Sequence, residues 1–316
     1  MGERHGNCKS RDSTERVVIM YDSKKPYKEE VLRRIKTTWK PNYIPHSSTD
    51  GIGTKGFYHW QQRTFQNAAL DFLAMNLNDL AVMRATPIEL HDHITIPRED
   101  IPAICEIVDT LVAESKKRNI VIDSGETSIH ENFPGLEISG TIVGKITEHK
   151  PNRFYCGDYL VGIESGGLHS NGFTKIREIF GNEFRKEFAE PTLIYSDLIL
   201  KLIKNFDVHG MVHITGGAYT RLKEFLTDSD IVINRHELKP QKIFEEIYSK
   251  KISDEEMYKT FNCGAGFILS VPRHTLEDIT SEISLDGFRT DIIGRVTRGK
   301  GKVRIQSAFS EKQIIL

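Results

Sequence analysis

The chain has 316 residues, and its 43 basic and 44 acidic side chains leave a formal charge of −1 at pH 7. This balance offers no electrostatic attraction to nucleic acid or to an anionic membrane, and no apolar run approaches the roughly 20 residues of a membrane span. The first fifteen residues lack the apolar core of a signal peptide, and the four cysteines form no CxxC pair. The composition therefore predicts a cytoplasmic protein with reduced thiols and with no nucleic acid or membrane as partner.

The first half of the chain contains short apolar runs and amphipathic stretches. We expect its first fifteen residues to be disordered, because they are polar and carry no apolar periodicity. The spacing of apolar residues predicts helices at 27–38, 67–85 and 102–117, and strands at 16–21, 94–96, 119–123 and 136–146. A glycine-rich loop at 47–56 separates the first helix from the second.

A polar connector at 149–157 predicts a domain boundary, with an N-terminal domain at 1–149 and a C-terminal domain at 150–316. Beyond the connector, predicted strands alternate with predicted helices. The strands are expected at 158–163, 211–214, 231–233, 264–271 and 290–296, and the helices at 172–180, 219–226, 240–248 and 275–283. This alternation predicts an α/β (α+β) fold.

The glycine-rich loop has the sequence SSTDGIGTKG. Its three glycines let backbone amides approach a ligand without obstruction by a Cβ atom. Asp50 is a candidate ligand for a divalent cation, and Lys55 is a candidate contact for phosphate. The spacing is not that of a Walker A loop, and a plain turn with a solvated lysine is the alternative.

The longest predicted helix carries three polar residues on an otherwise apolar surface. Asp71 and Asn78 project within about 20° of each other, and Asp79 lies about 80° from Asp71. A buried carboxylate is costly unless it is paired or bound to a cation, so this helix is a candidate metal site. Pairing with Arg63, Arg84 or a neighbouring loop is the alternative.

Two further segments carry titratable side chains. His91 and His93 share one face of a strand, a spacing that can suit zinc, while Asp92 points to the other face. No further Cys/His cluster supplies the remaining ligands, so a half-exposed strand end is the preferred interpretation. Glu126, in DSGETS, follows a predicted strand, and ligands collect at strand ends in open α/β sheets. An ordinary turn or helix N-cap is the alternative there.

Two predicted strand-to-helix junctions are rich in small residues: SGGLHSNG at 165–172 and TGG at 215–217. Ser170 or Asn171 can cap the helix that follows the first junction, and the free amides of a helix start attract anions. His169 is placed to hydrogen-bond a phosphate or to move a proton, although a structural histidine is the alternative. Two such junctions suggest a polyanionic ligand, such as a nucleotide or a sugar phosphate.

The segment FNCGAG at 261–266 enters a predicted strand. Asn262 could cap a turn or contact a ligand. Cys263 is expected to be a buried thiol, because no histidine lies nearby in the sequence to activate it as a nucleophile.

Taken in order, six segments resemble the aminoimidazole ribonucleotide synthetase family, the phosphoribosylformylglycinamidine cyclo-ligases of purine biosynthesis. They are STDGIGTK, LDFLAMNLNDL, SGET, SGGLHSNGF, HITGGA and EEMYKTFNCGAG, and the match extends from about residue 47 to the C-terminus. Each segment alone is a weak signal, whereas six in the family's order are specific.

The resemblance implies a two-domain fold in which each half is a sheet flanked by helices. It implies a homodimer, in which the N-terminal domains of two chains close a shared β-barrel. It also implies the reaction: ATP and magnesium convert formylglycinamidine ribonucleotide, the small-molecule substrate, to aminoimidazole ribonucleotide, ADP and phosphate. Positioning and charge stabilisation would do most of the work in such a phosphoryl transfer.

The resemblance further implies roles for individual residues. Asp50, Glu126 and His169 would act in catalysis, and Asp50, Asp79 and Glu126 would hold magnesium. ATP would be bound by Lys55 as the counter-charge of its phosphates, together with Lys28, Gly51, Gly53, Thr54, Asp71 and Asn78. The substrate would be bound by Ser170, Asn171, Gly172, Thr215, Gly216 and Gly217.

The N-terminal segment departs from the family pattern, which opens with Tyr-Lys-Asp-Ala-Gly-Val-Asp and a glycine-rich stretch. Here Tyr27 and Lys28 precede Glu-Glu-Val, and no glycine occurs between Gly6 and Gly51. Either a lysine in another frame, such as Lys24, covers the nucleotide, or nucleotide binding is altered.

Two other kinds of function remain open from the sequence. One is another ATP-dependent small-molecule enzyme of the same superfamily, with a thiamine monophosphate kinase ranked ahead of a selenophosphate synthetase. The other is a non-catalytic homologue that serves as a binding subunit. A test of ATP turnover separates the second from the first.

Overall fold

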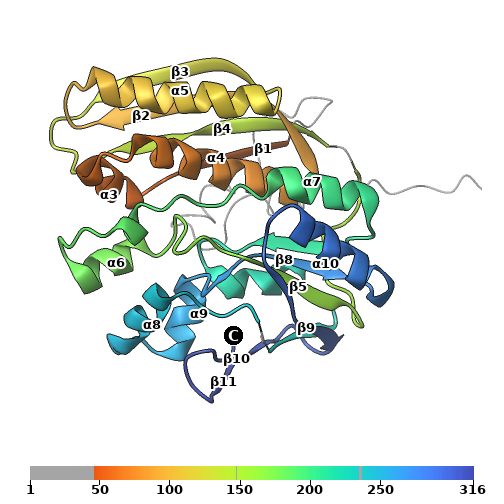
Figure 1. Ribbon diagram of the computed structural model, residues 1–316. Coiled ribbons are helices and arrows are strands. Elements are labelled where there is room, and N and C mark those ends of the chain that lie inside the picture. The colour runs from red at the N-terminus through yellow and green to blue at the C-terminus, as the bar shows by residue number, and fades with distance from the viewer. Residues whose placement is uncertain (1–45, 147, 235–236) are drawn as a thin grey trace, which may run out of the picture. The chain divides into compact units, whose positions relative to one another are not determined.

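The computed structural model describes residues 46–316 with the exception of residues 147, 235 and 236. The strand expected at 16–21, the helix expected at 27–38 and Lys28 lie outside the described residues. Two β-sheets follow one another along the described chain, each with its own helices (Figure 1). The last strand of the first sheet ends at Ile146, and the first strand of the second sheet begins at Tyr159.

The first sheet has four strands in the order β1-β4-β2-β3. These are β1 (His46–Gly51), β2 (Ala85–Ile96), β3 (Val121–Ile129) and β4 (Glu137–Ile146). β2 and β3 run parallel, whereas the other neighbours are antiparallel. The accompanying helices are α3 (Lys55–Gln62), α4 (Phe65–Val82) and α5 (Ile101–Lys117), and α4 and α5 share a buried core with the sheet (Figure 1).

Alternation along each strand decides which face of the first sheet a side chain occupies. Leu90 and Ile94 are buried in the core shared with α4 and α5. His91 and His93 alternate with them and therefore lie on the opposite face. The shared face predicted for the two histidines is confirmed, but both lie in the middle of β2 rather than at a strand end.

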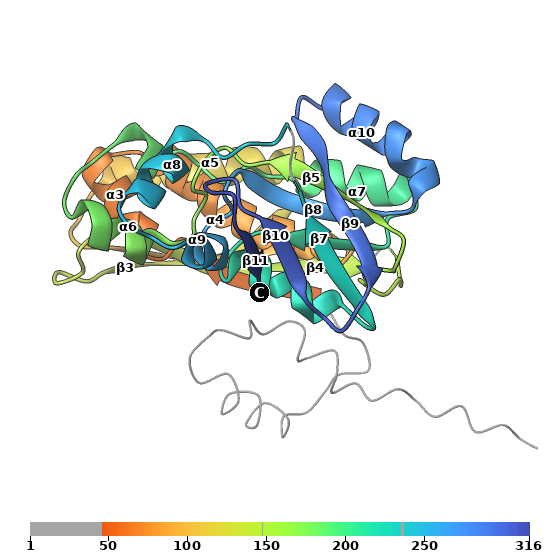
Figure 2. The same ribbon diagram turned by 90° about the horizontal axis from the view of Figure 1, so that it is seen from below.

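The second sheet has seven strands in the order β11-β10-β7-β9-β5-β8-β6. Its strands are β5 (Tyr159–Glu164), β6 (Gly210–His213), β7 (Ser229–Ile233), β8 (Ala265–Val271), β9 (Thr290–Arg298), β10 (Val303–Gln306) and β11 (Gln313–Ile315). Its helices are α6 (Phe173–Phe180), α7 (Ser196–Asn205), the 3-10 helix η2 (Ala218–Phe225), α8 (Lys242–Ser249), α9 (Asp254–Thr260) and α10 (Leu276–Leu285). α3, α6 and α8 gather at one end of the molecule, and α7 and α10 at the other (Figure 2).

The predicted α/β fold is confirmed, and the two longest helices lie where the apolar spacing places them. α4 is buried along most of its length, as its all-round apolar surface indicates. The first strands differ from expectation. β1 occupies part of the loop predicted at 47–56, because all six of its residues pair with β4. β2 begins nine residues earlier than expected, and its ladder accommodates Pro87 at a register shift between Pro87 and Glu89.

Other differences involve short elements. β3 continues through DSGETS, so Glu126 lies within a strand and not at the end of one. The helix expected at 219–226 is the 3-10 helix η2. α7, α9, β10 and β11 were not predicted, although the apolar residues of α7 recur at helical spacing. No helix in the described part of the chain is long and apolar enough to cross a membrane.

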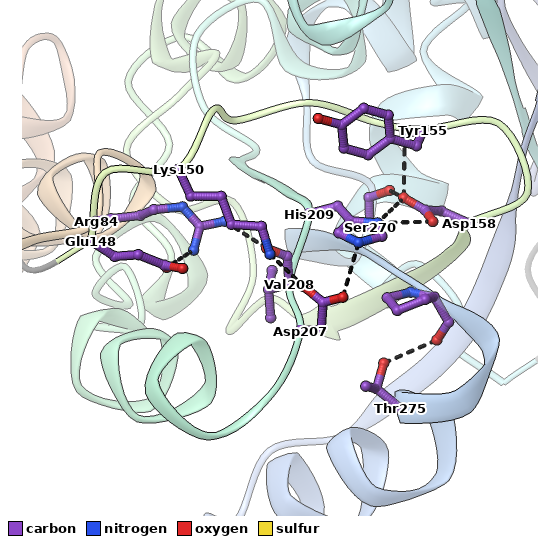
Figure 3. A network of polar contacts seen from close by, with 11 residues as sticks. Arg84, Glu148, Lys150, Tyr155, Asp158, Asp207, Val208, His209, Ser270 and Thr275 are labelled. Atoms are coloured by element: carbon purple, nitrogen blue, oxygen red, sulfur yellow. Dashed lines mark hydrogen bonds and ion pairs between the residues drawn. The ribbon is translucent and has the colours of Figure 1, made fainter.

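A polar network fastens the connector between the two sheets (Figure 3). Arg84, buried at the end of α4, forms an ion pair with Glu148 and donates to the carbonyl oxygen of Val208 at 2.6 Å. Farther along, the ring nitrogens of His209 lie 2.9 Å from an oxygen of Asp158 and 3.1 Å from an oxygen of Asp207 (Figure 3). These contacts tie the first sheet to the edge of the second.

Candidate active site

Asp71 is the most heavily bonded side chain between the two sheets. It is fully buried on α4, and its carboxylate lies 2.7 Å from both Lys55 Nζ and His59 Nε2. Ser170 Oγ donates to it at 2.8 Å, and Thr192 donates both its backbone N–H, at 2.7 Å, and its hydroxyl, at 2.6 Å. One carboxylate thus joins α3, α4 and two loops of the second sheet.

Charge pairing decides the protonation of this cluster. Burial alone would raise the pKa of Asp71, but Lys55 and His59 outweigh it and hold that pKa below its usual value. Burial lowers the pKa of Lys55 and of His59, and Asp71 opposes this in both cases. The result is an ionised carboxylate paired with a buried ammonium.

The pairing changes how Lys55 and Asp71 are interpreted. The Lys55 ammonium is fully buried and also donates to the carbonyl oxygen of Glu190 at 2.5 Å, so the alternative of a solvated lysine does not hold. Pairing of Asp71 with Arg63 or Arg84 does not occur either, since these bind Asp100 and Glu148. Lys55 and Asp71 bond to protein groups and hold the site together.

Asn78 makes hydrogen bonds with both ends of its buried amide. Its Oδ1 accepts from the backbone N–H groups of Tyr195 and Ser196 at 2.7 and 3.1 Å, and its Nδ2 donates to the carbonyl oxygen of Leu193 at 2.9 Å. Nδ2 also lies 3.3 Å from Nε2 of His213. Asn78 therefore positions the start of α7 and the His213 ring.

Asp79 is the more accessible carboxylate of α4, with a quarter of its side chain exposed. Its Oδ1 lies 3.3 Å from Nδ1 of the buried His213. Because Nε2 of that ring faces the Asn78 amide donor, Nδ1 carries the proton and donates to Asp79. The histidine orients the carboxylate, as outer partners do for metal ligands.

Strand register separates Glu126 from the other predicted metal ligands. Residues paired with one another across the strands form a row, and their side chains lie on the same face of the sheet. One such row contains Asp50, Gly140, Asp92 and Gly125. Gly140 faces the Phe72 ring, so this row faces α4. The next row ends at Glu126, whose side chain therefore lies on the opposite face. Three strand spacings of about 4.8 Å add to about 14 Å between the Asp50 and Glu126 backbones. Asp50 and Asp79 lie on the same side of the sheet, and Glu126 does not join them.

One trio of metal-capable side chains occurs in the part of the chain that the structure describes. It comprises Glu89, His91 and Asp123, whose ligand atoms lie within 4.8 Å of one another. Both ring nitrogens of His91 are engaged, Nε2 by Glu89 at 2.7 Å and Nδ1 by Ser124 Oγ at 2.7 Å. Protein groups therefore occupy both nitrogens of His91, and the Asp123 carboxylate lies 3.8 Å from Nδ1. Asp92 points away from this trio, and burial raises the pKa of this carboxyl.

His169 is buried, with a positive φ of 58°, and has one unpaired polar atom. Its Nε2 accepts from the backbone N–H of Gly166 at 3.2 Å, so Nδ1 carries the proton. Nδ1 has no hydrogen-bond partner among the described residues. Burial lowers the pKa of His169 well below its usual value, so the ring is neutral. A buried N–H without a protein partner calls for an acceptor from outside the described chain, such as a water molecule or a ligand.

The start of α6 lacks the side-chain cap that Ser170 or Asn171 was expected to provide. Its N-cap is Gly172, with φ of 76° and no capping hydrogen bond. Ser170 bonds instead to Asp71, and the buried Nδ2 of Asn171 has no partner among the described residues. Thr54, after β1, approaches this turn, with its Oγ1 3.3 Å from Thr174 Oγ1. The uncapped amides retain the capacity to bind an anion.

The TGG junction at 215–217 is held by hydrogen bonds to residues of the η2 helix that follows it. Thr215 Oγ1 accepts from Arg221 at 2.6 Å, and the carbonyl oxygen of Thr215 accepts from Ala218 at 2.7 Å. Gly216 and Gly217 are partly exposed, and the φ of 84° at Gly217 starts η2. Backbone atoms of this turn are therefore available to a ligand.

Asn262 links the two junctions. Its Nδ2 donates to the carbonyl oxygen of Gly167 at 2.8 Å, and its Oδ1 accepts from Ser165 Oγ at 2.8 Å. Tyr219, in η2, donates to the backbone oxygen of Asn262 at 2.8 Å. The next residue, Cys263, is a buried thiol as predicted, with a φ of 47°. Asn262 thus holds the loop that carries His169.

Comparisons with known proteins agree with this arrangement. The family description "AIR synthase related protein, N-terminal domain" matches residues 38–146, and its C-terminal counterpart matches residues 156–306. A phosphoribosylformylglycinamidine cyclo-ligase from Saccharolobus solfataricus is 35% identical over 80% of this chain and 79% of its own length. The chain belongs to the AIR synthase related family. Another such relative, from Thermococcus gammatolerans, is 32% identical over 84% of this chain and 83% of its own.

Solved structures show that the AIR synthase related fold is shared more widely. Hydrogenase maturation protein HypE in complex with ATP superposes with a TM-score of 0.63 at 14% identity, over 88% of this chain and 86% of the other. Thiamine monophosphate kinase from Aquifex aeolicus gives a TM-score of 0.63 at 14% identity, over 90% of this chain and 96% of the other. At these identities the likeness concerns the fold alone.

Proposed function

We propose that this chain catalyses the ATP-dependent cyclisation of formylglycinamidine ribonucleotide to aminoimidazole ribonucleotide. Relatives of that name resemble it over about four-fifths of its length. The observation that carries the proposal is the buried, unpartnered N–H of His169, on the loop that leads three residues later to the uncapped start of α6 at Gly172. A phosphorylated substrate offers acceptors to both groups.

The proposed reaction has two steps. ATP transfers its γ-phosphoryl group to the formyl amide oxygen, which gives ADP and makes that oxygen a good leaving group. The ribosyl-bearing nitrogen of the amidine then attacks the activated carbon. The new C–N bond closes the ring, the C–O bond to phosphate breaks, and the attacking nitrogen loses its proton. We propose that His169 Nδ1–H donates a hydrogen bond to the charge that develops on this oxygen.

Asp50 and Asp79 are the proposed ligands of magnesium. Their carboxylates lie on the same side of the first sheet, and hard oxygen ligands suit this ion. Magnesium, when bound, would neutralise charge on the ATP phosphates. His213 orients Asp79 through Nδ1–H, and Asn78 orients His213.

The remaining site residues divide between binding and positioning. Gly51, Gly53 and Thr54 are proposed to contact ATP phosphates, and Lys28 remains a proposed ATP contact from outside the described residues. Ser170, Asn171, Gly172, Thr215, Gly216 and Gly217 are proposed to hold the substrate. Lys55, Asp71 and Asn78 are proposed to act by positioning, because their polar groups bond to the protein.

We further propose that the protein is a cytoplasmic homodimer, in which the open face of the first sheet closes against a second copy. Polar side chains occupy that face, including His91, His93 and Glu126. Glu126 would then act from within the shared barrel and not at the ion held by Asp50 and Asp79.

The test is an assay with formylglycinamidine ribonucleotide and magnesium-ATP that reads ADP and aminoimidazole ribonucleotide together. Equal amounts of both products are expected. ADP without the imidazole product, and turnover when thiamine monophosphate is supplied, would favour the kinase alternative. Neither product from a folded sample would favour a non-catalytic binding subunit.

A further inference from the structure

A cavity of about 310 Å³ lies between the glycine-rich loop and α6. One wall is formed by Gly53, Thr54 and Phe57, and a second by residues 133–137. Arg177, in the second turn of α6, completes the lining. The cavity therefore borders both the loop proposed to bind phosphate and the helix that follows the His169 loop.

Arg177 is held in place without being neutralised. Its guanidinium carbon lies 4.3 Å from the centroid of the Phe57 ring, a stacked arrangement that fixes the side chain. The residue is exposed, and within the described chain its guanidinium has no carboxylate at ion-pair distance. Arg185 shows the contrast: it stacks on Phe180 at 4.7 Å but is paired with two carboxylates. An anchored and unpaired guanidinium at a cavity wall is suited to an anionic ligand.

The direction of the side chain brings it toward the start of α6. Side chains on a helix lean toward its N-terminus, so Arg177 extends over the turn that contains Phe173 and Thr174. Thr54 Oγ1 lies 3.3 Å from Thr174 Oγ1 across that turn. Of these residues, Thr54 and Arg177 line the cavity, so one hydroxyl and one guanidinium group border it. The carboxylate in the lining, Glu137, accepts from the N–H of Gly53 at 3.3 Å.

We propose that Arg177 binds a phosphate group in this cavity and is a specificity-determining residue for one of the two phosphorylated ligands of the reaction. The inference rests on the proposed function. The planar guanidinium group of Arg177 can donate to two phosphate oxygens at once, and the Thr54 hydroxyl supplies a further donor. The rings of Phe57 and Phe133 provide apolar surface for a ribose. The phosphate is that of the ribonucleotide substrate or one of those of ATP, which share this chemistry.

Steady-state kinetics of Arg177→Ala and Arg177→Lys separate the two sources. We expect Arg177→Ala to raise KM for one phosphorylated ligand by about 10- to 100-fold and to leave KM for the other within about twofold. Arg177→Lys should recover only part of the lost affinity, because an ammonium group cannot bind two phosphate oxygens in the planar geometry of a guanidinium group. Arg185→Ala is the matched control, since it removes a stacked arginine whose charge is already paired.

A substrate without its 5′-phosphate completes the test. If Arg177 binds that phosphate, the preference of the wild-type protein for the nucleotide over the nucleoside should largely disappear in Arg177→Ala. If it binds ATP, the preference should survive and the affinity for ADP should fall instead. Unchanged KM values for both ligands in a folded Arg177→Ala would overturn the inference.

A direct binding measurement tests the role of Arg177 independently of the proposed reaction. Calorimetry with ribose 5-phosphate and with ADP requires no turnover, so it remains decisive if the cyclo-ligase assay fails. Wild-type protein should bind one of these probes at least about tenfold more tightly than Arg177→Ala does. Equal binding of both probes by the two proteins would contradict the role of Arg177.

Discussion

Thr192 donates its backbone N–H to Oδ1 of Asp71 at 2.7 Å, although 121 positions separate the two residues. The bond joins the buried helix of the first sheet to a loop of the second. It also shows what Asp71 does: its carboxylate has protein donors on every side, including a buried lysine and a buried histidine.

Replacement of Asp71 should therefore destabilise the whole structure. Asp71→Asn leaves the Lys55 ammonium buried without its counter-charge, a change that costs about 3–5 kcal/mol of unfolding free energy. Urea denaturation measures the loss. Asp197→Asn is the control, because this exposed carboxylate pairs with Arg118 at the surface and should cost less than about 1 kcal/mol. Equal losses in the two variants would contradict the assigned role.

The magnesium proposal distinguishes Asp79 from Glu126. Asp79→Ala should lower magnesium-dependent turnover about 100-fold or more and should abolish the thermal stabilisation by magnesium-ATP, while the protein remains folded. Glu126→Gln should keep the wild-type magnesium requirement, because register places this side chain on the other face of the sheet. Titration of activity and of melting temperature with magnesium measures both. A raised magnesium requirement in Glu126→Gln would show that Glu126 reaches the ion.

Replacement of Asn262 should lower the catalytic rate by more than the loss of stability from its hydrogen bonds alone would explain. Asn262→Ala frees the loop that carries His169, and misplacement by about 1 Å can cost about 100-fold in rate. We expect kcat/KM to fall by about 10- to 100-fold. Asn152→Ala is the matched control, since Asn152 makes two comparable bonds to the backbone of Met211. It should lose similar stability in urea and keep its kcat/KM.

Stability should fall on mild acidification because two buried histidines are held neutral. Burial lowers the pKa of His169 and of His59 in the folded state, so the unfolded chain binds more protons below about pH 6.5. Their contribution is present above that pH and is lost as the pH falls toward the folded pKa values, by up to about 1.4 kcal/mol per pH unit for each group.

Urea denaturation at several pH values between 7.5 and 5.5 measures this dependence. His169→Gln should reduce the slope of unfolding free energy against pH by the contribution of one histidine. His274→Gln replaces an exposed histidine and should leave the slope as in the wild type. The same slope in wild type and His169→Gln would show that His169 is not held neutral.

Several features of the site were predictable from the sequence because they depend on local order. The apolar circumference of the helix at Asp71 predicts its burial, and a buried carboxylate predicts a partner. The six family segments predict the fold through their sequence order. Cys263 was expected to be a buried thiol, and it is one.

The identity of the partners depends on positions far apart in the sequence. Lys55 was expected at an ATP phosphate because its glycine-rich neighbours suit one, but the fold buries it against Asp71 and Glu190. Ser170 was expected to cap α6, but the same carboxylate attracts its hydroxyl. Local reasoning cannot choose between a nearby helix start and a carboxylate 99 positions away.

The sequence by itself therefore determined the family, the alternation of strands and helices, and the set of polar residues that cannot be buried alone. Strand register decided which of these polar residues lie on the same face of the sheet. Asp50 and Glu126 both lie on strands and both carry carboxylates, yet a difference of one row places them on opposite faces of the sheet. Because side chains alternate along a strand, a single step in pairing determines which carboxylates can share an ion, and only the tertiary structure sets that pairing.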